Sequence, residues 1–141
     1  MSFSLEKICD NDIHIGVLYG LLNSRTHKIS HKNIPSLEEH SSFVRNHPYR
    51  AWFLIKVMDE VIGTVYLTEQ NTIGLNIREE FIKASLPYVI EKIRSEFEPL
   101  PELKSIRAAQ FSINVAPSNI ILIEALEQYG CKCSQISFLL K

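Results

Sequence analysis

The sequence predicts one α/β (α+β) domain, built on a mixed, mostly antiparallel sheet that is flanked by about four helices. Two apolar runs, Trp52–Val57 and Val61–Leu67, flank a short polar turn. Runs rich in β-branched and aromatic residues, bounded by turn residues, are typical of paired antiparallel strands. A third run, Thr72–Ile77, precedes a helical pattern. The second half of the chain has two β-α-β passages, so part of the sheet should be parallel.

Length and composition narrow the class of protein. The chain has 141 residues, which favours a single domain over residues 1–141. Lys plus Arg (15) nearly balances Asp plus Glu (16), so we expect no nucleic-acid partner. No apolar run approaches the roughly 20 residues of a membrane span, so we expect no membrane partner. The first residues do not resemble a signal peptide, and the three cysteines favour a cytoplasmic location with reduced thiols.

The first half of the chain predicts one strand and two helices. Phe3–Ile8 alternates as an edge strand does, and Asp10–Asp12 supplies helix-start residues. The following helix should bury one face, formed by Ile13, Val17, Leu18, Leu21 and Leu22. Thr26–Pro35 is polar and should be a loop; its His27 and His31 lack a third ligand, so we expect no metal. Ser36 and Glu39 match a capping box, and their helix should run to about Asn46, before Pro48.

The second half predicts helix, strand, helix and strand. Apolar residues from Ile82 to Phe97 step by three or four, and starting the regular helix at Ser85 would place Pro87 in its first turn. Ser105–Val115 should be a strand. Pro117–Asn119 should open a last helix that ends at Gly130, with Leu122, Ala125, Leu126 and Tyr129 on its inner face. Cys133–Leu140 should be a final strand, whose edge could pair with a second copy to give a homodimer.

Three segments carry a resemblance to a known family: the hairpin Trp52–Val65, the strand Ile73–Ile77 and the strand-Asn-helix-Gly sequence Ile113–Cys131. Together with the element order they resemble the GCN5-related N-acetyltransferases (GNAT). Cys131 stands where that family usually has Phe. Ser36–Phe43 is similar to the second helix of members that acylate nucleotide-linked amino sugars. The resemblance implies acetyl-CoA as co-substrate and donor. The acceptor would be a primary amine of a small molecule, an amino sugar among them, or of a peptide.

The resemblance also implies where the cofactor binds. In the family, the fourth and fifth strands splay apart and the thioester lies between them; here these would be Thr72–Ile77 and Ser105–Val115. The backbone of Leu75, Asn76 and Ile77 would pair with the pantetheine arm. Asn119 matches the family's Asn after the fifth strand, which contacts the cofactor. Lys83, with Ser85 beside it, would serve the phosphates. Each side chain also has an ordinary structural interpretation, Asn119 as a helix cap and Lys83 as a surface lysine.

Three residues are catalytic candidates. His47 could act as a base, since histidine titrates near neutrality. Glu69 could deprotonate an ammonium through water, and Asn114 could hydrogen-bond across the splayed strands. Surface or structural roles are the alternative for each. The family's frequent tyrosine acid would fall at Leu126, so the thiolate would leave without it.

The segment Ile82–Pro87 departs from the family's glycine-rich phosphate loop. It has no glycine, Pro87 removes a backbone donor, and Glu79 and Glu80 add negative charge just upstream. This departure favours an alternative reading, in which the chain is a catalytically degenerate GNAT-fold protein that acts as a binding or assembly module.

Overall fold

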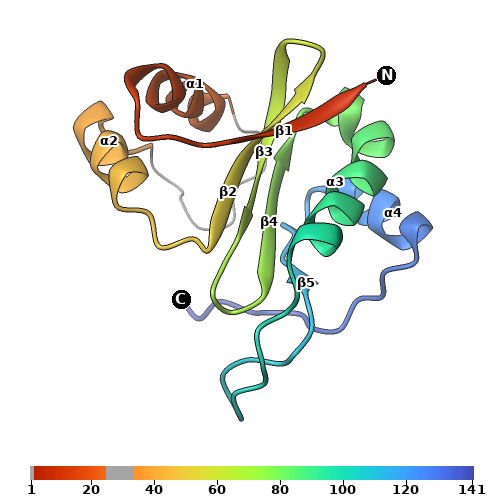
Figure 1. Ribbon diagram of the computed structural model, residues 1–141. Coiled ribbons are helices and arrows are strands. Elements are labelled where there is room, and N and C mark those ends of the chain that lie inside the picture. The colour runs from red at the N-terminus through yellow and green to blue at the C-terminus, as the bar shows by residue number, and fades with distance from the viewer. Residues whose placement is uncertain (1, 25–33) are drawn as a thin grey trace.

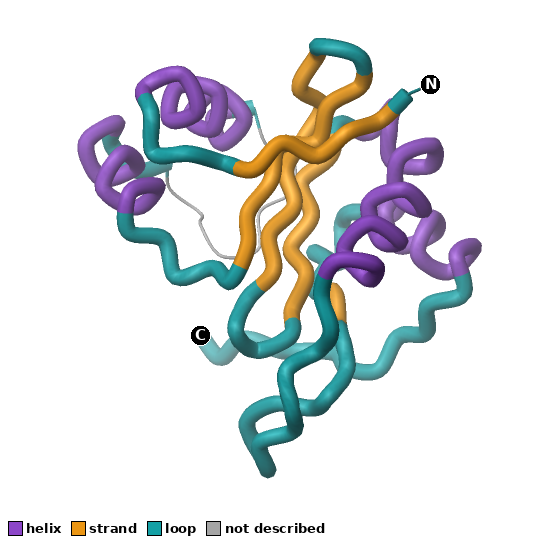
Figure 2. Tube along the Cα trace, viewed as in Figure 1, coloured by secondary structure: helices purple, strands orange, loops and turns teal. Residues whose placement is uncertain are grey.

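The sheet has five strands in the order β1-β2-β3-β4-β5 (Figures 1 and 2). The computed structural model describes residues 2–24 and 34–141. Strands β1 to β4 are antiparallel to their neighbours, and β5 is parallel to β4. The mixed, mostly antiparallel sheet that the sequence predicts is therefore confirmed. The strands are β1 (Phe3–Lys7), β2 (Ala51–Val57), β3 (Glu60–Leu67), β4 (Thr72–Ile77) and β5 (Ser112–Ile113).

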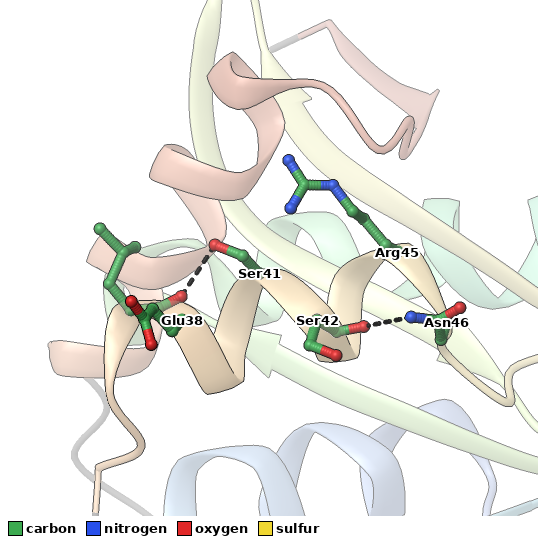
Figure 3. A pocket seen from close by; sticks show the side chains of 6 residues that line it. Glu38, Ser41, Ser42, Arg45 and Asn46 are labelled. Carbon is green, nitrogen blue, oxygen red and sulfur yellow. Dashed lines mark hydrogen bonds between the residues drawn. The ribbon is translucent and has the colours of Figure 1, made fainter.

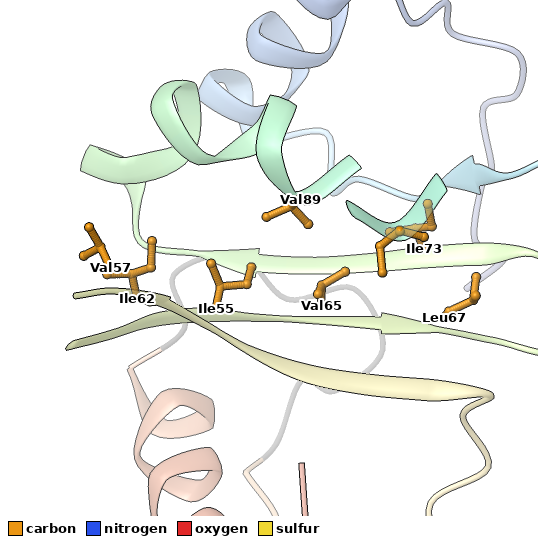
Figure 4. Packing of buried hydrophobic residues seen from close by; sticks show 8 residues of the cluster. Ile55, Val57, Ile62, Val65, Leu67, Ile73 and Val89 are labelled. Atoms are coloured by element: carbon orange, nitrogen blue, oxygen red, sulfur yellow. The ribbon is translucent and has the colours of Figure 1, made fainter. Parts of the chain in front are cut away.

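Two helices cover each face of the sheet. On one face, α1 (Asp12–Asn23) and α2 (Leu37–Arg45) pack on β2 and β3. On the other, α3 (Ile82–Glu96) lies against the sheet and α4 (Ile120–Tyr129) packs on α3. Figure 4 shows Val89 of α3 above the apolar side chains of the strands. That central cluster comprises Ile55, Val57, Ile62, Val65, Leu67, Ile73, Val89 and Ile93.

Local signals placed three boundaries correctly. Ser36 and Glu39 form the predicted capping box at the start of α2. Asn119 caps α4, and Gly130 ends it with a left-handed φ of 109°. The turn between β2 and β3 holds Met58 at φ 56°, and this side chain points into solvent.

The buried face of α1 differs from the prediction. Leu18 is buried as predicted, but Ile13 is 76% exposed, and His14 and Ile15 are buried in addition. His14 can be buried because both ring nitrogens have partners: Nδ1 accepts from the Cys9 N–H at 2.8 Å, and Nε2 lies 2.9 Å from Glu6 Oε2. The spacing of hydrophobic residues does not predict that a polar ring is buried when both of its nitrogens have partners. The predicted loop and His27 and His31 fall mostly outside the described residues.

The start of α3 also differs. A short 3-10 turn, η1 (Glu79–Phe81), leads directly into α3 at Ile82, so Ser85 is not its cap. Pro87 is the sixth residue of α3 rather than a first-turn residue. It is tolerated there because Pro87 and Lys83 are both exposed, and water can reach the Lys83 carbonyl that lacks an N–H partner.

One predicted strand is much shorter in the structure, and another does not form. The strand predicted at Ser105–Val115 shrinks to the two residues of β5. Cys133–Leu140 forms no strand; the chain after α4 is irregular, and its residues are exposed. Pairing of this segment with a second copy stays a prediction. Within the part of the chain that is described, no helix is long and apolar enough to cross a membrane.

Candidate functional site

The edge of β4 that faces β5 is half open. The two parallel strands pair only at Thr72 with Ser112 and at Ile73 with Ile113, while β4 continues to Ile77. The Thr72 carbonyl accepts a hydrogen bond from the N–H of Thr68, the residue after β3. The Arg78 N–H donates to the carbonyl of Ile62 in β3. The backbone N–H and C=O groups of successive residues point to opposite edges of a strand. Since those of Thr72 and Arg78 point toward β3, those of Leu75 and Ile77 point away from it. No described strand pairs with them there.

A cavity of about 230 Å³ adjoins this open edge. The end of α1, the end of β4, the start of η1 and α3, and the start of α4 enclose it. Three predicted cofactor residues of β4 and the predicted Asn line it together. The full lining is Leu21, Ser24, Ile62, Leu75, Asn76, Ile77, Arg78, Glu79, Glu80, Ile82, Asn119 and Leu122.

Asn119 both caps α4 and lines the cavity. Its Oδ1 accepts from the Leu122 N–H at 3.4 Å, which caps α4, and the residue also lines the cavity. The start of α4 therefore faces the open end of β4. First-turn N–H groups of a helix attract negative charge or a carbonyl oxygen. The prediction for Asn119 gave a cap and a cofactor contact as alternatives, and the cap is present.

An ion-paired arginine lies in the cavity lining, at the end of β4. Arg78 Nη1 lies 2.5 Å from Glu60 Oε1, and its Nη2 lies 2.6 Å from Glu80 Oε1. The hydrogen bonds that Arg78 donates to Glu60, and secondly to Glu80, raise the pKa of Arg78. The pKa of Glu80 is lowered, first by a hydrogen bond from its own backbone N–H and then by Arg78. Among the described residues of the lining, Arg78 is the one cation, and Glu60 and Glu80 already hold it.

Lys83 and Ser85 do not line the cavity. Lys83 is exposed on α3. Ser85 is fully buried, and its Oγ finds no hydrogen-bond partner among the described residues. Both residues follow the cavity lining along α3, so the geometry gives neither of them a direct contact with a ligand in the cavity.

The three catalytic candidates are dispersed, and none lines the cavity. Glu69 lies in the exposed turn before β4, at the opposite end of the strand, where its carbonyl accepts from Arg107. Asn114 follows β5 and is exposed. His47 lies between α2 and β2, and burial lowers its pKa. Its Nδ1 accepts from the Tyr49 N–H at 3.2 Å, so the neutral ring carries its proton on Nε2.

An aromatic cluster on the α1 and α2 side was not predicted. Tyr49 stacks on Tyr66 with ring centroids 4.1 Å apart, and Trp52 meets Tyr49 edge to face at 5.1 Å. Tyr66 lies opposite Gly74 of β4, and a Cβ at Gly74 would collide with the Tyr66 ring. The cluster therefore borders β4 just after its pairing with β5 ends. The signal in the sequence was Trp52 and Tyr66, aromatic residues of the two runs that are predicted as paired strands.

A second, larger groove of about 410 Å³ follows the outer side of α2 (Figure 3). Residues of this one helix and its cap line it: Leu37, Glu38, Ser41, Ser42, Arg45 and Asn46. Ser41 Oγ donates to the Leu37 carbonyl at 2.8 Å, and Asn46 Nδ2 donates to that of Ser42 at 3.0 Å. Because these polar groups bond within the helix, this groove offers a ligand less than the cavity at β4.

The chain is similar to solved structures of other proteins. No family model matches the chain, and no curated protein matches its sequence. A domain from Methanocaldococcus jannaschii superposes with a TM-score of 0.68 at 14% identity, covering 96% of this chain and 92% of that one. RimL, a ribosomal L7/L12 alpha-N-protein acetyltransferase solved with coenzyme A, gives a TM-score of 0.63 at 15% identity over 92% and 80%. AAC(6')-Iy, solved with a CoA bisubstrate analogue, gives 0.61 at 12% identity over 100% and 99%.

Proposed function

We propose that this chain, which has the fold of the GCN5-related N-acetyltransferase superfamily, is an N-acyltransferase. It would take an acetyl group from a pantetheine thioester of the acetyl-CoA type and transfer it to a primary amine. The observation that carries the proposal is the open edge of β4, where Leu75 and Ile77 present backbone groups that pair with no described strand to a cavity. The acetyltransferases that share the fold, two of them solved with CoA or a CoA analogue, support it.

The open edge suits a pantetheine arm because that arm is linear and contains two amides. A linear amide ligand can add to an exposed strand edge much as a peptide does, through main-chain hydrogen bonds. Apolar side chains of Ile62 and Leu122 line the same cavity and suit the methylene groups between the amides. Asn76 faces β3 with its backbone, so we assign the pairing to Leu75 and Ile77.

The transfer itself requires few protein groups. The neutral amine nitrogen attacks the thioester carbonyl carbon, a C–N bond forms, and the C–S bond breaks to release a thiolate. The proton lost by the amine goes to water and on to the thiolate. His47 is not suited to take it, because the Tyr49 N–H already occupies the lone pair of Nδ1. Glu69 and Asn114 stay candidates without a contact to the cavity.

The acceptor would approach from the aromatic cluster. Tyr66 borders β4 opposite Gly74, where the pairing of β4 and β5 has ended, and the Tyr49 ring lies against it. Aromatic faces bind ammonium groups and the apolar faces of sugar rings. A small amine, an amino sugar among them, or the amino group of a peptide would fit this side of β4. The cytoplasmic location stays a prediction; the three cysteines are unpaired.

A second candidate is a non-catalytic binding module with the same fold. The ion pairs of Arg78 favour it, because Glu60 and Glu80 already hold this cation, which a nucleotide phosphate near the start of α3 would otherwise meet. In that case no thioester would bind at β4, and the chain would act through a protein partner.

Isothermal titration with acetyl-CoA and with S-acetylpantetheine separates the two candidates. Micromolar to millimolar binding of either ligand, about −8 to −4 kcal/mol, is expected. Ser24→Trp should abolish it, because Ser24 is exposed and lines the cavity, so the indole would fill the ligand's place. Ser42→Trp, in the groove of α2, is the matched control and should leave binding unchanged. Failure of both ligands to bind would contradict the transferase and leave the binding module.

A further inference from the structure

Two parts of the described chain suit one another and do not meet: the outer edge of β5 and the segment Cys133–Leu140, here called the tail segment. We propose that the tail segment of one copy adds as a strand to the outer edge of β5 in a second copy, and that two copies exchange these segments reciprocally. The second copy of this chain then completes the sheet at β5. This inference concerns assembly and does not depend on the proposed acyl transfer.

The outer edge of β5 presents open backbone groups. β5 lies at the end of the sheet, and β4 is its neighbour among the described strands. The Ser112 N–H donates to the Asn71 carbonyl at 3.0 Å, on the side of β4. Since the backbone groups of successive residues point to opposite edges of a strand, those of Ile113 point to the outer edge, where no described strand pairs with them. Such an edge is a template for pairing with another chain.

The side chains around β5 alternate as those of a longer strand do. Phe111, Ile113 and Val115 are partly buried and pack on the apolar clusters at α3 and α4, whereas Ser112 and Asn114 are exposed. A strand added at the outer edge would therefore continue an apolar face on the side of α3 and α4 and a polar face on the other side.

The tail segment has the pattern of the strand that this edge lacks. It is irregular and exposed over its whole length (Figure 2). In an extended conformation Ile136, Phe138 and Leu140 share one face, with Gln135 and Ser137 on the other. The first three side chains are 74%, 86% and 97% exposed. Monomers rarely expose large contiguous apolar surface, so we expect a partner to cover this face.

The area to be covered favours a reciprocal exchange between two copies. The three apolar side chains of one tail segment would remove only roughly 300–600 Å² from water, at roughly 100–200 Å² each. The six of two segments would remove on the order of 1,000 Å², and the surface that they cover adds to it. Specific interfaces bury about 1,200–2,000 Å² in total, so the exchange reaches the size of a stable dimer. Two-fold symmetry then closes the assembly at two copies.

Sedimentation equilibrium of the full chain tests the inference. The unaltered protein should be a dimer at about 0.1 mM. The double variant Ile136→Lys, Phe138→Lys puts two charges on the inward face and should weaken dimerisation at least about tenfold. Gln135→Lys, Ser137→Lys adds the same charges at the alternate positions and is the matched control, which should stay dimeric. All four positions lie in the exposed tail segment, so both variants should keep the fold of the monomer.

Amide hydrogen exchange, followed by NMR, locates the interface. The Ile113 N–H should exchange at least about tenfold more slowly in the dimer than in the monomer of Ile136→Lys, Phe138→Lys. The Ser112 N–H, which already donates to Asn71, should change little.

Four results would overturn the inference. They are a monomer at about 0.5 mM, a dimer that both double variants dissociate equally, a dimer that neither dissociates, and a dimer without protection of Ile113. Protection of Ile113 in a monomer would count against it as well, because the tail segment would then pair with its own β5. These measurements need no acyl donor, so the proposed function is tested separately.

Discussion

At the scale of single residues, Asn71 holds the turn before β4 to the long loop that follows α3. It is fully buried and has a left-handed φ of 63°. Its Nδ2 donates to the carbonyls of Leu100 and Ala108 at 2.9 and 2.8 Å, and its Oδ1 accepts from the Leu100 N–H at 2.7 Å. The Asn71 carbonyl accepts from Ser112, the first residue of β5. The side chain of Asn71 thus holds the loop before β5, and its backbone carbonyl holds the first residue of β5.

Asn71→Ala should therefore lower the free energy of unfolding by about 2–4 kcal/mol, because buried loop groups lose their partners and alanine disfavours a positive φ. Urea denaturation measures this loss. Asn71→Gly is the matched variant, since glycine accepts the backbone conformation and loses only the side-chain bonds. It should be destabilised less than Asn71→Ala. A loss below about 0.5 kcal/mol in both variants would show that Asn71 does not hold the loop.

His40 predicts a dependence of stability on pH. The ring is buried, its Nε2–H donates to the Ile15 carbonyl at 3.3 Å, and burial lowers its pKa. The unfolded chain then binds the proton more readily, so stability is complete above the unfolded pKa of about 6.5 and is lost as pH falls below it. His40→Gln should reduce the loss measured by urea denaturation between about pH 7.5 and 5.5, a range in which the carboxylates stay ionised.

Some of that loss should remain in His40→Gln, because burial lowers the pKa of His47 as well. Replacing both histidines should remove most of it. An unchanged pH dependence in the double variant would mean that other groups cause the acid sensitivity.

At the scale of elements, α3 contains an interior proline at its solvent side. Pro87 removes the hydrogen bond to the Lys83 carbonyl, which a helix interior would otherwise make. Pro87→Ala should stabilise the protein by about 1–3 kcal/mol, measured as a raised thermal midpoint. An unchanged or lower midpoint would show that the cost of the missing hydrogen bond is offset, for example because proline reduces the conformational freedom of the unfolded chain.

The elements that the sequence predicted well are those defined by local rules. The strands of the central hairpin, the capping box at Ser36 and the left-handed Gly130 each depend on residues close together in the chain. The length of β5 does not. Asn71 and Arg107 tie its preceding loop to the turn before β4, over 29 to 38 residues of chain, and no local pattern encodes such bonds.

At the scale of the whole molecule, the candidate site was predicted in part. The resemblance placed Leu75, Ile77 and Asn119 near a donor, and they line one cavity. The resemblance also implied phosphate contacts at Lys83 and Ser85, and neither residue lines the cavity. The ion pair of Arg78 with Glu60 joins residues 18 apart, so the sequence showed both charged residues without showing that they pair.

The central claim is that a thioester donor adds to the open edge of β4. Amide hydrogen exchange, followed residue by residue by NMR with and without saturating S-acetylpantetheine, tests it most directly. The N–H groups of Leu75 and Ile77 point to the open edge and should become protected, while those of Gly74 and Asn76, which face β3, should change little. Saturation without protection at Leu75 and Ile77, or protection confined to the groove of α2, would contradict the account.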